Sequence, residues 1–112
     1  MTDLTAKQCI PCRGGVPPLE SAAIERLHAG LDPAWRVVGA HHLEREYRFP
    51  DWKSAFAFVT RVSELAESVN HHPDIALSWG RVGMQLWTHA IDGLSESDFV
   101  FAAKVDRLPQ GS

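Results

Sequence analysis

The chain has 112 residues, of which 45% are hydrophobic and 22% charged, and its formal net charge at pH 7 is -3. This length and composition predict one globular domain with a modest core, and the lack of a basic cluster argues against nucleic acid as a direct partner. No apolar run reaches the length of a membrane-spanning helix, and the first residues lack the apolar core of a secretory signal. We therefore expect no membrane association and a cytoplasmic location.

Residues 1–16 are expected to form an irregular N-terminal arm, because Pro and Gly are dense around Cys9 and Cys12. A Cys-x-x-Cys pair can be half of a zinc site or a redox dithiol. A structural zinc needs four ligands, and the candidates to complete one are histidines elsewhere in the chain: His28, His41 or His42. We favour two reduced cysteines without a metal, and we assign residues 17–112 to a single domain.

The first half of this domain predicts a helix followed by two strands. Apolar residues recur every four positions from Leu19 to Leu31, which is typical of a helix. Strands are expected over residues 35–38 and 42–49, and the second alternates apolar and charged side chains between its faces. Three histidines of this half are expected to face solvent: His28, His41 and His42.

A long helix is predicted to begin after Asp51, an N-cap residue, and to end near Asn70. One apolar stripe at helical spacing comprises Trp52, Ala55, Phe56, Val59, Val62, Ala66 and Val69. Phe58 and Leu65 are predicted to lie off this stripe. A helix that is apolar on more than one side usually buries a second face, which indicates a homo-oligomer; a wide core-facing surface is the alternative.

Two strands and a helix complete the domain. The strands are expected over residues 74–79 and from Val82 towards Ile91, joined by a turn. The last helix has Ser95 at its N-cap and Asp98 at the third helical position, which is the arrangement of a capping box.

Three of the six histidines fall between Glu67 and Asp98: His71, His72 and His89. In an antiparallel hairpin the end of the fourth strand returns to the start of the third, so His89 is predicted to lie near the other two. Glu67 precedes His71 by four residues and would share a helical face with it. Imidazole, with a pKa of about 6.5, both gives and takes protons near neutral pH. This cluster predicts a proton-transfer site, although adjacent histidines also occur in ordinary surface turns.

The ordered set of Glu67, the run 71–73, Trp79, His89 and Asp98 resembles the pterin-4a-carbinolamine dehydratase family, and the resemblance covers roughly residues 17 to 108. It implies an α+β fold, with a four-stranded antiparallel sheet and three helices packed on one face in the order α-β-β-α-β-β-α. It also implies a homodimer or homotetramer that dehydrates 4a-hydroxytetrahydropterin to quinonoid dihydropterin without a metal or a redox cofactor.

The resemblance assigns proton transfer to His71 and His89, pterin binding to His72, and the orientation of a histidine to Glu67. It implies that the pterin ring is lined by further residues around these histidines: Pro73, Thr88, Ala90 and Ile91. Trp79 and Asp98 belong to the motif, and capping is the favoured role of Asp98.

Four aromatic residues are possible walls of the site but are interpreted mainly as core: Trp35, Phe56, Phe58 and Trp79. Trp87 departs from the family pattern, because a small or hydroxylated residue is expected at its position. It would narrow or cover the pterin site. Some members of the family act as binding proteins, so a non-catalytic protein-binding or dimerisation role is the alternative.

Overall fold

The computed structural model describes residues 17–109. Its elements, in chain order, are α1 (Ser21–His28), β1 (Arg36–Val38), β2 (His42–Arg48), α2 (Trp52–Val69), β3 (Asp74–Ser78), β4 (Arg81–Leu86), the 3-10 helix η2 (His89–Ile91) and α3 (Glu96–Asp106). The strands form one antiparallel sheet in the order β1-β2-β4-β3. The predicted α+β fold is confirmed.

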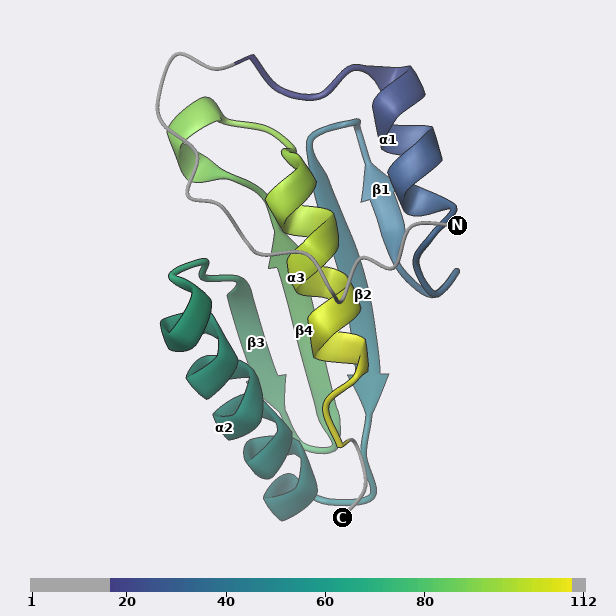
Figure 1. The fold of residues 1–112 in the computed structure, drawn as a ribbon. Coiled ribbons are helices and arrows are strands. Elements are labelled where there is room, and N and C mark those ends of the chain that lie inside the picture. Colours follow the sequence, from purple (N-terminus) through teal and green to yellow (C-terminus); the bar gives the residue numbers. More distant parts are fainter. Residues whose placement is uncertain (1–16, 110–112) are drawn as a thin grey trace.

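The sheet has one face covered by helices and one face left open. Side chains of the central strands β2 and β4 that point towards the helices are buried, among them Leu43, Tyr47, Val82, Met84 and Leu86. Figure 1 shows α3 lying across these strands, α2 running along β3, and α1 beside β1. Polar side chains such as Glu44 and Gln85 alternate with the buried ones and therefore face away from the core.

The two ends of α2 lie where they were predicted, and each has a capping residue. The Asp51 carboxylate accepts a hydrogen bond from the Ser54 backbone amide at 2.8 Å, and this bond lowers the pKa of Asp51. At the other end Asn70 adopts the left-handed conformation, with φ of 53°, which stops the helix. Residue 71 therefore leaves α2 in a new direction.

The predicted apolar stripe of α2 was partly wrong. Phe58 was placed off the stripe but is fully buried, whereas Trp52 and Phe56 are 45% and 55% exposed. The buried stripe follows the spacing of Ala55, Phe58 and Val62, which puts Trp52 and Phe56 on a neighbouring face of the helix. α2 thus has a core-facing stripe and a second, exposed aromatic face.

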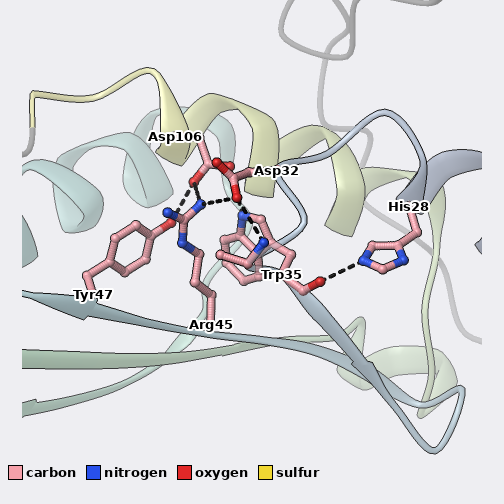
Figure 2. Close-up of polar contacts among 7 residues, drawn as sticks. His28, Asp32, Trp35, Arg45, Tyr47 and Asp106 are labelled. Carbon is pink, nitrogen blue, oxygen red and sulfur yellow. Dashed lines mark hydrogen bonds and ion pairs between the residues drawn. The ribbon is translucent and has the colours of Figure 1, made fainter.

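A carboxylate at the end of α3 ties this helix to the sheet (Figure 2). Asp106 accepts hydrogen bonds from Trp35 Nε1 at 2.8 Å, Tyr47 Oη at 2.6 Å and Arg45 Nη1 at 3.0 Å. Burial raises the pKa of Asp106, and the bonds from Tyr47 and Trp35 and the charge of Arg45 oppose this only in part. Burial, followed by the hydrogen bond to Asp106, also raises the pKa of Tyr47, so the phenol remains a donor.

Candidate active site

The three histidines of the predicted site lie at one end of the β3–β4 hairpin. Asp74, the first residue of β3, pairs with Gln85, which is next to the last residue of β4. The histidines that precede β3 and the histidine that follows β4 are therefore brought to the same end of the sheet, as predicted. Figure 1 places the start of α3 at this end too.

His71 forms a hydrogen bond with a buried carboxylate of α3. Its Nε2 lies 2.7 Å from Oδ1 of Asp98, and the side chain of His71 is 10% exposed while that of Asp98 is fully buried. The ring also packs against Phe101, with ring centroids 5.7 Å apart. Because an ionised carboxylate only accepts, the proton of neutral His71 resides on Nε2 and leaves Nδ1 as the basic nitrogen.

Asp98 has a second set of partners, which confirms its predicted capping role. Its Oδ2 accepts hydrogen bonds from the Ser95 backbone amide and from the Thr88 hydroxyl, both at 2.9 Å. The hydroxyls of Thr88 and Ser95 also lie 2.8 Å apart. The Thr88 hydroxyl therefore supports Asp98 from a buried position, and the contact of Thr88 with a pterin stays a prediction.

Glu67 was predicted to pair with His71, but it forms a hydrogen bond with His72 instead. His72 Nε2 lies 2.7 Å from Glu67 Oε1, and the two side chains are 53% and 80% exposed. The expected sharing of a face by Glu67 and His71 requires α2 to continue through residue 71. The left-handed Asn70 ends the helix before that point, so it is His72 that returns to Glu67.

The prediction that His89 lies on a strand was wrong. β4 ends at Leu86, and the backbone of Thr88 pairs with that of Gly93 to close a short loop that contains η2. Asp92 follows η2 in the left-handed conformation, with φ of 49°, which ends any extended strand. His89 Nε2 lies 3.8 Å from Asp74 Oδ1, and its side chain is 58% exposed.

The other predicted pterin-lining residues surround these histidines unevenly. Pro73 and Ile91 are half-buried and Ala90 is exposed at the same end of the sheet. Trp79 is 72% exposed and lies at the β3–β4 turn, the opposite end of the hairpin. The predictions of Trp79 and Phe56 as core were wrong, whereas Trp35 and Phe58 are fully buried.

The predictions for the remaining histidines need correction. His28 contacts the Trp35 carbonyl oxygen through Nε2 at 2.6 Å (Figure 2). His41 and His42 were predicted as solvated turn residues, but their Nδ1 atoms lie 3.1 Å apart and both rings contact Trp87. Local sequence patterns do not predict this contact, because Trp87 lies more than 40 residues from His41 and His42 in the chain.

A groove of about 500 Å³ lies beside the site. Its lining includes Glu44, Asp74, Gly83 and Gln85, and none of the predicted site residues, all of which are described, takes part. Asp74 joins this groove to the surroundings of His89. Spacing alone did not single out Asp74 as a site residue, although it directly follows the His-His-Pro run.

Residues 17–109 contain no group of three or more His, Cys, Asp or Glu side chains placed to hold a metal ion. Within the same range no helix has the length and hydropathy needed to cross a membrane. The predictions for the N-terminal arm, including Cys9 and Cys12, lie outside the described residues.

Curated proteins similar to this chain share a single name. A protein of Rubrobacter xylanophilus is 58% identical over 96% of this chain and all of its own length, and one of Alkaliphilus metalliredigens is 53% identical over 96% of both chains. A protein of Rickettsia bellii is 49% identical over 94% of this chain and 93% of its own. Each is named provisionally as a pterin-4-alpha-carbinolamine dehydratase.

Solved structures support the same relationship. A transcriptional coactivator/pterin dehydratase from Brucella melitensis is 30% identical, with a TM-score of 0.74 over 80% of this chain and 95% of its own. A pterin dehydratase-like protein identified as a RuBisCO assembly factor in the alpha-carboxysome is 27% identical, with a TM-score of 0.57 over 65% of this chain and 86% of its own. The family model described as pterin 4 alpha carbinolamine dehydratase matches residues 17–108. The chain therefore belongs to the pterin 4 alpha carbinolamine dehydratase family.

Proposed function

We propose that the protein dehydrates a 4a-hydroxytetrahydropterin to the quinonoid dihydropterin by histidine acid–base catalysis, in the recycling of tetrahydropterins in the cytoplasm. The observation that carries this proposal is the buried hydrogen bond between His71 and Asp98. A buried carboxylate that holds an imidazole in one tautomer is a recurrent device for making the other ring nitrogen a base.

The chemistry needs one base and one acid. His71 accepts the proton of a pterin ring nitrogen at Nδ1, while Asp98 stabilises the imidazolium that forms. His89 gives a proton to the hydroxyl at the 4a carbon, the carbon–oxygen bond breaks, and water leaves as the ring carbon–nitrogen double bond forms. The Asp74 carboxylate, 3.8 Å from His89, suits a proton-donating imidazolium. Solvent then restores both histidines to their starting states.

The remaining site residues bind the pterin. His72 is exposed beside the proton-transfer groups, so it holds the ring or the departing hydroxyl, and Glu67 orients its imidazole. Pro73, Ala90 and Ile91 line the ring. The groove at Asp74 has a volume in the range typical of small-molecule sites and offers room for a pterin substituent.

The test is the rate of 4a-hydroxytetrahydropterin breakdown with wild type, His71→Ala and His89→Ala. We expect wild type to accelerate dehydration and each variant to lose about 10²- to 10⁴-fold of that acceleration, the usual contribution of a positioned acid or base. His28→Gln is the matched control, because His28 contacts a backbone carbonyl away from the site. A wild-type rate equal to the uncatalysed rate would sink the proposal.

A protein-binding role is the second candidate, and the exposed aromatic face of α2 favours it. Trp52 and Phe56 are large apolar side chains directed outwards, and exposed apolar patches commonly mark interaction sites. One structural relative is named as a coactivator and another as an assembly factor. A homodimer or homotetramer formed through this face is compatible with either role. Normal dehydration by a monomeric Phe56→Glu variant would separate catalysis from assembly.

A further inference from the structure

A cluster of aromatic rings lies between the β1–β2 turn and the loop that carries His89. The ring centroid of Trp87 lies 5.4 Å from that of His41, 5.9 Å from that of His42 and 4.4 Å from that of His89. The contact between Trp87 and His89 is edge-to-face, an arrangement that aromatic rings favour. Trp87 therefore contacts His89 on one side and His41 and His42 on the other.

A hydrogen bond joins the same turn to the far side of the His89 loop. His41 Nε2 lies 2.8 Å from Asp92 Oδ1, and Asp92 directly follows η2. At its base the loop is closed by the backbone pairing of Thr88 with Gly93. The segment from residue 88 to residue 93 is thus held at its base by backbone bonds and at Asp92 by a side chain from another part of the sheet.

The hydrogen bonds indicate which ring nitrogens of His41, in the β1–β2 turn, and His42, at the start of β2, carry a proton. The Asp92 carboxylate only accepts, so His41 carries a proton on Nε2. Neutral His41 then accepts at Nδ1 from Nδ1 of His42, 3.1 Å away. His42 Nε2 is buried and makes no hydrogen bond among residues 17–109, and Glu44 Oε2 lies 3.7 Å from it.

We propose that His41 is a positioning residue for the reaction: through Asp92 and Trp87 it holds the His89 loop and so sets the direction of the His89 imidazole. The kinetic consequence rests on the proposed function, whereas the placement of His89 can be measured without any turnover. The side chains of His41 and Asp92 are 37% and 88% exposed. Exposed pairs contribute little, so we expect a loss of about fivefold and no abolition of activity.

The test compares His41→Ala with His41→Gln, whose side-chain amide can still donate to Asp92. In His41→Ala we expect kcat to fall about fivefold with a nearly unchanged KM. We also expect the ring-nitrogen signals of His89 in ¹H–¹⁵N correlation spectra to shift. In His41→Gln most of both effects should be reversed. Arg48→Ala is the control, because it removes an exposed ion pair with Glu46 at the opposite end of β2 and should change neither measurement.

The outcomes separate this proposal from the function itself. Unchanged His89 signals in His41→Ala would overturn it, whatever the kinetics show. Equal impairment of His41→Ala and His41→Gln would also overturn it, because the bond to Asp92 would then not hold the loop. If wild type fails to dehydrate the pterin but the His89 signals shift in His41→Ala and recover in His41→Gln, the positioning role is supported and the proposed function fails.

Discussion

At the scale of single residues, Asp98 shows how one carboxylate serves two structures. Oδ1 contacts His71, and Oδ2 accepts from Ser95 and Thr88. A side-chain amide has one accepting oxygen and one donating nitrogen, so it cannot satisfy donors on both sides. Asp98 therefore has no isosteric replacement that preserves both roles.

Asp98→Asn is expected to lower kcat for pterin dehydration by about 10- to 100-fold, part of the 10²–10⁴ that a positioned acid–base pair supplies. It should also lower the free energy of unfolding by about 1–3 kcal/mol, because a buried donor loses its acceptor. Steady-state kinetics and urea denaturation measure the two effects. Ser95→Ala is the control: it weakens the cap by about 1 kcal/mol but keeps the His71–Asp98 bond, so kcat should remain within a few-fold of wild type.

Glu67→Gln should have a much smaller effect than Asp98→Asn. The Glu67–His72 pair is largely exposed, and exposed pairs contribute about 0–1 kcal/mol. We expect kcat and KM each to change by less than about fivefold. A loss as large as that of Asp98→Asn would contradict this expectation and show that the Glu67–His72 pair is as important for dehydration as the His71–Asp98 pair.

The sequence was sufficient to predict that the His71–His72–Pro73 run and His89 lie at the same end of the sheet, because the antiparallel register of β3 and β4 fixes that. It was not sufficient to predict which side chains pair there. The partner of His71 depends on the left-handed backbone of Asn70 and on the docking of α3 near the sheet end. Neither can be inferred from spacing, so Glu67 was expected beside the wrong histidine.

At the scale of elements, α3 is held on the sheet by the Asp106 cluster (Figure 2). Its donors are Tyr47 and Arg45 of β2, 59 and 61 residues from Asp106 in the chain, and Trp35, just before β1 and 71 residues away. Such distant side-chain pairing leaves no periodic pattern, and it was not predicted. The end of β4 was not predicted either, because the alternation of the two strand faces in the sequence continues past Leu86 although the strand ends there.

Tyr47→Phe removes one of the three donors to Asp106 and leaves the ring in place. We expect the free energy of unfolding to fall by about 1–2 kcal/mol, since a partly buried carboxylate loses a hydrogen bond. Urea denaturation followed by tryptophan fluorescence measures this change. An unchanged midpoint and slope would mean that the phenol hydroxyl does not contribute to the docking of α3.

The raised pKa of Asp106 predicts a pH dependence of stability. The folded protein binds this proton more tightly than the unfolded chain does, whose carboxyl titrates near 3.8. The stability that protonated Asp106 contributes is therefore present at acid pH and is lost as the pH rises through the raised value. The difference in unfolding free energy, wild type minus Asp106→Asn, should decrease from acid to neutral pH. A difference that grows over this range would show that the pKa is instead lowered.

At the scale of the whole molecule, the order of the three α-helices and four strands followed from the sequence because several of them have a clear boundary signal. Asp51 and Ser95 begin helices, and Gly80 supports the turn between β3 and β4 with φ of 65°. A Cβ at Gly80 would lie 2.8 Å from the Phe49 carbonyl oxygen, so this turn admits no larger residue without a shift. The exposed second face of α2 was also indicated by the apolar excess of that helix.

If the protein assembles through the exposed face of α2, a substitution on that face should lower the molecular mass of the protein in solution. Phe56→Glu places a charge beside Trp52 and should shift the protein from an oligomer towards a folded monomer, as measured by analytical ultracentrifugation and circular dichroism. Trp79→Ser changes another exposed aromatic residue, away from α2 and on the β3–β4 turn, and should leave the mass unchanged. An unaltered mass for Phe56→Glu would exclude this face of α2 as the contact.

The double role of Asp98 also bears on how the family can diverge. A lineage that no longer needs dehydration still needs a cap on its last helix, so selection for folding alone would retain this aspartate. His89 is largely exposed and would be free to drift, and His71 packs against Phe101 but caps no helix. The aspartate in a distant relative is therefore weak support for inherited activity, whereas joint retention of the two histidines is the more informative signature.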